Sequence, residues 1–338
     1  MLDAFIFAAN AVLPIVILIV LGYLLKKAGM LTKEFLDVGN KLTFRVLLPV
    51  MLFCNVYEIE RLNDINVPFI VYGIAGVIVI FFLGIAVCCA FTKDSAKRGS
   101  LIQAVFRSNY AIIGIPLAAS LFGDKGAAAA GVMSAFCVPT FNILGVVTLT
   151  IFNGSSRGQD GNVKQGFNIK KILLGIVKNP LIIGTVAGLA VLGVRELFLM
   201  WDISFRLRDI TVIYKSLENV KSICTPFALI VLGGKFEFSA VSKLWKEIVF
   251  GTAVRTVAVP VLGLSAAFLF REQLGLSGEH FATYIGVFAT PVAVASAIMA
   301  KEMGADDELA GQMVVWTSLV SAVTIFIYVT ILRTLGIF

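Results

Sequence analysis

Residues 106–122, FRSNYAIIGIPLAASLF, place an arginine, an asparagine, a glycine and a proline inside a stretch whose flanks are apolar enough for lipid. Proline removes a backbone donor and clashes with the preceding turn, so an uninterrupted membrane helix is disfavoured here. In hydrocarbon an unpaired peptide group is costly, and such a break survives only inside protein or beside a watery cavity. The stretch therefore predicts a broken helix enclosed within a larger membrane protein.

The composition of the whole chain indicates the same class of protein. The 338 residues are 59% hydrophobic and 14% charged, whereas soluble domains are about 45–50% apolar and about 25% charged. Apolar runs of about 20 residues, each able to cross a hydrocarbon core of roughly 30 Å, recur along the chain. We expect an all-α polytopic membrane protein in contact with the lipid bilayer. Its net charge of +7 comes from lysines and arginines between the apolar runs, where they set the membrane topology, so it does not indicate nucleic-acid binding.

Ten apolar spans are predicted, and a polar segment divides them five and five. That segment, residues 153–171, is rich in Gly, Asn, Gln and Ser and is typical of a flexible cytoplasmic linker. It separates a first repeat, residues 1–152, from a second, residues 172–338. The spans are placed at 4–25, 38–57, 67–91, 99–122, 126–152, 172–194, 211–233, 245–270, 280–301 and 308–333.

Basic residues between the spans predict the orientation. With the N-terminus outside, the inner connections carry 13 lysines and arginines and the outer segments carry seven. This bias predicts a multi-pass cell-membrane protein with both termini outside. Residues 195–210 hold three of the seven outer cations and are interpreted as an outer amphipathic excursion.

Prolines recur at similar places in the two halves. The pairs lie in the first and sixth, second and seventh, and fourth and ninth spans, and they are Pro14 and Pro180, Pro49 and Pro226, and Pro116 and Pro291. Their spacings are 166, 177 and 175 residues, and the first pair is placed at the start of its spans. Because each half has an odd number of spans, the pattern predicts an inverted-topology repeat, which is common in secondary transporters.

The fourth and ninth spans predict an anion site where they break. In the ninth, Thr290 is expected as N-cap and Pro291 as the first residue of a new half-helix. In the fourth, Gly114 supplies flexibility before Pro116, and Asn109 supplies an amide. Two half-helix N-termini with free N–H groups would then approach the membrane midplane, which suits an anion. A pair of ordinary proline kinks is the alternative.

Several motifs resemble the auxin efflux carrier family over essentially the whole chain. The most specific are RSNYAIIGIPL, residues 107–117, and ATPVAVASAIMAKE, residues 289–302; LGYLLKKAGMLTKE, RVLLPVMLF and PFALIVLGGKF also match. The resemblance implies ten helices in two inverted repeats, with a scaffold of helices 1, 2, 6 and 7, usually dimeric. Helices 3–5 and 8–10 would form a transport domain whose broken helices 4 and 9 cross at the substrate site.

The resemblance also implies a role for one residue. In plant members the asparagine of the fourth-span motif contacts the substrate carboxylate, and Asn109 matches it. Bacterial members are commonly labelled malate permeases or generic transporters. Plant members have a long central loop, whereas residues 153–171 form a short one, so regulation through this loop is not expected.

Three side chains are candidates for substrate binding on physical grounds. An amide such as that of Asn109 can donate to a carboxylate without the desolvation cost of a buried charge. Arg255 lies about ten residues into the eighth span, where an arginine is costly unless it faces a cavity or a partner. Arg107 lies in the inner half of the fourth span, and an arginine could hold a second carboxylate. Helix packing for Asn109 and snorkelling for Arg255 are the alternatives.

Acidic residues are nearly absent from the spans, so the sequence offers no clear coupling-ion site, and no metal or cofactor is predicted. Glu218 is the main exception, and a local ion pair with Lys221 is expected. The five cysteines form no CxxC pair, and His280, the only histidine, is placed at the outer end of the ninth span. A monoanion leaving a negative-inside cell gains about 2.3 kcal/mol per 100 mV, which favours export without a coupled cation.

The function expected from the sequence is a secondary transporter that moves a small organic anion by alternating access, as a homodimer. A channel-like anion pore and an intramembrane enzyme are the alternatives. The chain has neither regularly spaced arginines nor a filter-like repeat, and it has no HExxH motif. Substrate identity, direction and coupling ion stay open.

Overall fold

The computed structural model describes residues 2–58, 66–153 and 169–338, so most of the predicted linker lies outside the described residues. Within these ranges every regular element is a helix, and one isolated antiparallel bridge pairs Ser108 with Val292. Five helical stretches of the described chain are long and apolar enough to cross a membrane, namely Val67–Phe91, Tyr110–Phe152, Pro180–Met200, Phe238–Leu269 and Asp307–Thr334. An all-helical chain with several candidate spans is therefore confirmed, whereas the count of ten stays a prediction.

The first half contains long helices and two π-helical turns, η1 and η2. Its elements are α1 (Leu2–Lys27), α2 (Lys33–Leu42), η1 (Thr43–Leu47), α3 (Leu48–Tyr57), α4 (Val67–Phe91), α5 (Ser95–Phe106), η2 (Tyr110–Gly114) and α6 (Ile115–Asn153). The last of these is two helices joined at Gly123, whose φ of 57° is left-handed and favours glycine. The predicted boundary between the fourth and fifth spans falls at this glycine.

The second half has the same kinds of element. They are α7 (Ile169–Val177), α8 (Pro180–Met200), the 3-10 turn η3 (Leu207–Asp209), α9 (Thr211–Lys235), α10 (Phe238–Ala253), the π-helical η4 (Val254–Ala258), α11 (Val259–Leu269), α12 (Gly278–Ala289), α13 (Val294–Glu302) and α14 (Asp307–Thr334). The predicted excursion at 195–210 starts too early, because α8 continues to Met200 before the chain turns.

The two prolines predicted at span starts have different outcomes. Pro180 begins α8 as predicted, with Asn179 as the N-cap that accepts the N–H of Leu181, although the bounds 172–194 of this span are displaced. In contrast, Pro14 lies inside α1 and does not start it. A proline removes only one backbone hydrogen bond, and continuing the helix pairs the remaining peptide groups in an apolar segment.

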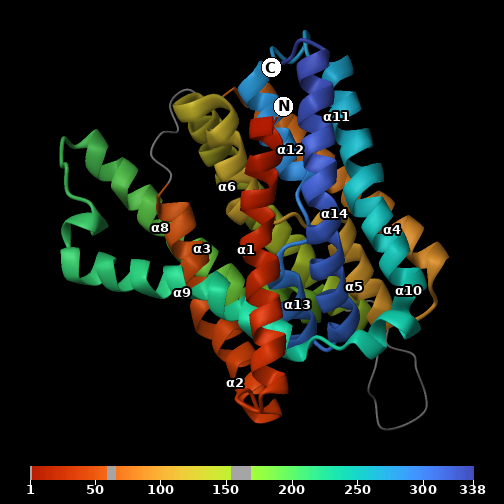
Figure 1. The fold of residues 1–338 in the computed structure, drawn as a ribbon. Coiled ribbons are helices and arrows are strands. Elements are labelled where there is room, and N and C mark those ends of the chain that lie inside the picture. Colours follow the sequence, from red (N-terminus) through yellow and green to blue (C-terminus); the bar gives the residue numbers. More distant parts are fainter. Residues whose placement is uncertain (1, 59–65, 154–168) are drawn as a thin grey trace.

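The helices form an elongated bundle with both ends of the chain at the same pole (Figure 1). In that view α8 and the first part of α9 project to one side, whereas α4, α10 and α11 lie on the other. The interrupted helices α5, α12 and α13 lie between these groups, and they contain the largest share of fully buried residues, including Phe106, Phe281 and Phe288. The core of the fold is therefore built around the breaks.

Glycines allow two pairs of helices to approach at backbone distance. A Cβ on Gly22 of α1 would lie 2.1 Å from the carbonyl oxygen of Ile230 in α9. A Cβ on Gly184 of α8 would lie 2.4 Å from the carbonyl oxygen of Pro49 in α3. Both distances are shorter than any real contact, so close packing at these crossings requires glycine.

We expect Gly184→Ala to lower the apparent melting temperature of the purified protein, because overpacking costs about 1–3 kcal/mol. Gly193→Ala, on the same helix, is the matched control, since nothing lies within 4 Å of its added Cβ. In a helix that control should stabilise by about 0.5–1 kcal/mol. Equal melting temperatures for the two variants would contradict the close crossing of α3 and α8.

Candidate functional site

The two interrupted spans break next to each other and pair through their backbones. Residues 107–109 separate α5 from η2, and residues 290–293 separate α12 from α13. The N–H of Asn109 donates to the carbonyl oxygen of Pro291 at 2.8 Å. In the other direction, the N–H of Ala293 donates to the carbonyl oxygen of Arg107 at 3.3 Å. Each break therefore supplies partners for peptide groups that the other leaves without a helical bond.

The residues predicted to start the second half-helix of the ninth span do not do so. Thr290 ends α12, and its hydroxyl donates to the carbonyl of Gly286 at 2.7 Å, so it is not an N-cap. Pro291 lies in the extended break, and α13 begins at Val294. The peptide oxygen of Pro291 is held by the opposite break, which keeps this residue extended and delays the helix.

In the fourth span the break comes before the predicted glycine and proline. Pro116 lies in the first turn of α6, after the π-helical turn, where a missing donor is tolerated. Gly114 has a packing role: a Cβ there would lie 2.9 Å from the Cα of Gly286 in α12. The contact brings the two interrupted spans together just beyond their paired breaks.

Arg255 forms hydrogen bonds with the C-terminal ends of two interrupted helices. Its side chain is fully buried, which rules out snorkelling, and its three guanidinium nitrogens donate to carbonyl oxygens at 2.8, 3.1 and 3.3 Å. The acceptors are Thr290, Val105 and Val287, at the C-terminal ends of α12 and α5. Helix C-termini carry unpaired carbonyls and partial negative charge, which a guanidinium complements.

Arg107 is buried in a different way. Only 3% of it is exposed, and its guanidinium donates to Gln103 Oε1 at 3.0 Å, to Asn142 Oδ1 at 2.6 Å and to the thioether sulfur of Met299 at 2.5 Å, all of them neutral. None of the residues that the structure describes forms an ion pair with Arg107. A buried cation without a counter-charge is costly, which makes this position a candidate anion site.

The surroundings of Arg107 are rich in donors. Because a guanidinium can only donate, Gln103 and Asn142 must turn their oxygens toward it, and their NH2 groups point elsewhere. Those two nitrogens and the side-chain nitrogen of Asn109 are all buried without a partner in the described structure. Leaving a buried donor unpaired costs about 1–3 kcal/mol. A ligand that brings acceptor oxygens would satisfy all of them.

A small cavity of about 60 Å³ lies beside these donors. Its polar wall includes Arg107, Asn109 and Asn142, and its opposite wall comes from α3 and α9. The sequence predicted the first two of these polar residues and missed Asn142 and Gln103. Asn142 is a polar residue within the apolar span predicted at 126–152, and this isolated position could have indicated a functional role.

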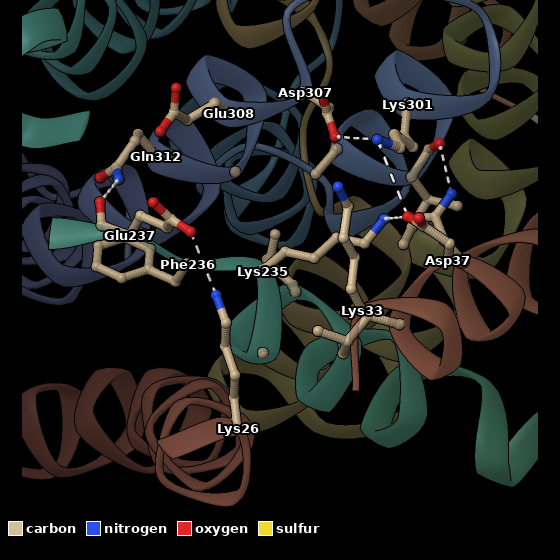
Figure 2. A pocket seen from close by; sticks show the side chains of 17 residues that line it. Lys26, Lys33, Asp37, Lys235, Phe236, Glu237, Lys301, Asp307, Glu308 and Gln312 are labelled. Atoms are coloured by element: carbon tan, nitrogen blue, oxygen red, sulfur yellow. Dashed lines mark hydrogen bonds and ion pairs between the residues drawn. The ribbon is translucent and has the colours of Figure 1, made fainter. Parts of the chain in front are cut away.

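A second cavity of about 490 Å³ opens at the lysine-rich end of the bundle (Figure 2). Asp37 of α2 accepts Lys235 of α9 at 3.1 Å and lies 3.9 Å from Lys301 of α13. Lys301 also pairs with Asp307 at 3.4 Å, and Lys26 pairs with Glu237 at 3.3 Å on the other side (Figure 2). Elements α9 and α13 contribute to the walls of both cavities.

The predicted ion pair of Glu218 with Lys221 is wrong: Lys221 pairs with Glu58, the residue that follows α3, and Glu218 is exposed.

His280 lies in the first turn of α12, at the start of the predicted ninth span. Its Nδ1 contacts Ser277 at 2.9 Å, and its ring packs on Phe69 with centroids 4.4 Å apart, so its contacts are structural.

Sequence comparisons show that the chain is similar to membrane transporters. A family model described as membrane transport protein matches residues 7–329. An uncharacterized transporter of Methanothermobacter thermautotrophicus is 21% identical over 96% of this chain and 98% of the relative. The uncharacterized transporter MJ1031 of Methanocaldococcus jannaschii is 25% identical over 80% of each chain. The uncharacterized transporter YfdV of Escherichia coli K12 is 24% identical over 87% of this chain and 88% of the relative.

Arg107 and Arg255 should respond differently to substitution. Arg255→Lys keeps the charge but cannot reach three carbonyl oxygens, so we expect a clear fall in apparent melting temperature. Arg107→Gln removes a charge that has no counter-charge, so the ligand-free variant should be at least as stable as the parent. Thermal unfolding in detergent measures both. A destabilised Arg107→Gln beside an unaffected Arg255→Lys would reverse the two assignments.

The ion pairs of Asp37 beside the larger cavity predict that the stability of the protein depends on pH. The hydrogen bond from Lys235, with further positive charge from Lys301 and Lys33, holds the pKa of Asp37 below its ordinary value of 3.8 although partial burial opposes this. A lowered carboxyl pKa stabilises the fold above the unfolded value, and this contribution is lost as pH falls through the folded value. The melting temperature of the parent should therefore exceed that of Asp37→Asn near neutral pH, and the difference should close below pH 3.8. A difference that is constant down to pH 3 would contradict these ion pairs.

Proposed function

The chain belongs to the membrane transport protein family, in agreement with its resemblance to auxin efflux carriers, and we propose that it is a secondary transporter for a small organic anion. The observation that carries the proposal is the uncompensated guanidinium of Arg107 beside the unpaired side-chain nitrogen of Asn109. A carboxylate would bring both the missing charge and the missing acceptors. Charge-assisted hydrogen bonds of this kind are among the strongest available to a protein site.

We propose alternating access as the mechanism. The cavity of about 490 Å³ opens at the lysine-rich pole, which the basic-residue bias assigns to the cytoplasm, and we propose that this conformation is open to the inside. The bridge between Ser108 and Val292 joins the two breaks beside the small cavity. We propose that it closes the route there, as expected for a carrier and not for an open anion pore. We propose export as the direction.

Two equivalent glycine contacts support the ten-helix inverted repeat. Gly22 meets the carbonyl oxygen of Ile230, and Gly188 meets that of Phe53. The glycines are 166 residues apart and their partners 177, the same spacings as the first two proline pairs. The third proline pair does not mark equivalent places, because the bridged residues of the two breaks are 184 apart and the prolines 175.

The helix contacts are consistent with the division into a scaffold and a transport domain. In the proposed scaffold α1 packs on α9 and α3 packs on α8, and the interrupted helices α5, α12 and α13 pack mainly on α4, α6, α11 and α14 of the proposed transport domain. The ion pair of Lys301 with Asp37 and the hydrogen bond of Asn40 to Glu302, 2.9 Å long, join α2 of the scaffold to α13. We propose that these contacts hold the inward-open arrangement and that the scaffold pairs with a second copy in the cell membrane, with both termini outside.

Substitution of the two central residues tests the proposal in proteoliposomes. Arg107→Gln and Asn109→Ala should each weaken the apparent affinity for a transported organic acid by about 10- to 100-fold, corresponding to about 1.5–3 kcal/mol for a bond to a charged group. Asn219→Ala, at an exposed position of α9, is the matched control and should transport normally. Saturable flux with the same half-saturation in all four proteins would place the anion site elsewhere.

A further inference from the structure

We infer that the site at the crossing takes a monocarboxylate with a short, compact apolar body. This substrate class excludes dicarboxylates, amino acids and aromatic acids. The inference rests on the proposed function and deepens it. Three properties of the small cavity carry it, namely the charge on its polar wall, the chemistry of its opposite wall and its volume.

The polar wall can neutralise one carboxylate. Arg107 is the only cation among the described residues that line the cavity, and Asn109 and Asn142 bring further donors to the same wall. The other fully buried arginine, Arg255, donates through all three nitrogens to backbone carbonyls and does not line the cavity. A second carboxylate would therefore be buried without a counter-charge, which is strongly unfavourable.

The opposite wall has no partner for charge. It consists of Leu48, Met51 and Leu52 from α3 together with Cys224, Thr225 and Ala228 from α9, and the neutral hydroxyl of Thr225 is its most polar group. Among the described lining residues no Asp or Glu faces the cavity. The ammonium group of an amino acid would find no carboxylate there. A hydrocarbon body, in contrast, replaces water against an apolar surface and is favoured.

The volume limits the body to a few carbons. A cavity needs about 10–15 Å³ to hold one water-sized group, so about 60 Å³ has room for roughly four to six non-hydrogen atoms. A carboxylate group uses three of these positions. One to three further carbons fill the space, as in propionate, butyrate or isobutyrate. A benzene or indole ring exceeds it.

A thermal-shift panel on the purified full-length protein tests the substrate class. The panel contains acetate, propionate, butyrate and isobutyrate; succinate and malate; valine; and benzoate and indole-3-acetate. We expect stabilisation by the two- to four-carbon monocarboxylates alone, lost in Arg107→Gln and retained in Asn219→Ala. Competition against radiolabelled butyrate in proteoliposomes should rank the acids in the same order.

Changing the apolar wall should change the preferred length and leave recognition of the carboxylate intact. Leu52→Ala enlarges the cavity and should shift the preference toward hexanoate over butyrate by about 10-fold, the lower bound for one methylene in an apolar pocket. Ala228→Val reduces the cavity and should shift the preference toward propionate. Both residues are buried, so two variants of opposite effect keep the test informative if one fails to fold.

The outcomes separate this inference from the proposed function. Stabilisation of the parent by a dicarboxylate, an amino acid or an aromatic acid that disappears in Arg107→Gln overturns the substrate class and leaves the anion transporter standing. If every acid that stabilises the parent also stabilises Arg107→Gln, or if none stabilises the parent, both proposals fall. A length preference unchanged in both wall variants overturns the assignment of the apolar wall.

Discussion

The pairing of two broken helices through their backbones is the constraint on which the rest of the structure depends. A helix that stops in the middle of an apolar fold leaves carbonyl and N–H groups without partners. Here the break after α5 and the break after α12 supply partners to each other through the bridge at Ser108 and Val292. Arg255 and the facing glycines at 114 and 286 also contact the interrupted helices and hold these two segments in register.

Arg107 and Arg255 illustrate how identical buried side chains can have different surroundings. Arg255 donates to backbone carbonyls at helix ends, which suit a guanidinium well. Arg107 has two amide oxygens and a thioether sulfur from side chains, and satisfying it leaves the amide nitrogens unpaired. The first arrangement is complete in the protein alone. The second lacks a group that carries negative charge and lone pairs, and the proposed site rests on this difference.

Much of this organisation could be predicted from sequence, because apolar runs and helix breakers are local signals. The span at 67–91 was predicted at its observed bounds, and the breaks were placed within the correct spans. Details of the breaks could not be predicted. Thr290 and Pro291 have the pattern of a helix start, but a hydrogen bond to Asn109, 182 residues away, keeps the chain extended there. Likewise nothing local distinguishes Arg107 from Arg255, because their partners come from distant helices.

The small cavity draws its two walls from different parts of the chain. The lining donors belong to α6 and the first break, whereas the apolar surface belongs to α3 and α9. On the proposed function, the charged group and the carbon skeleton of the substrate would therefore contact separate sets of residues. Substitutions in α3 and α9 would then change the size of the acid that fits and leave the paired breaks intact. The chemistry of the charged group and the shape of the rest of the substrate would thus be set independently of each other.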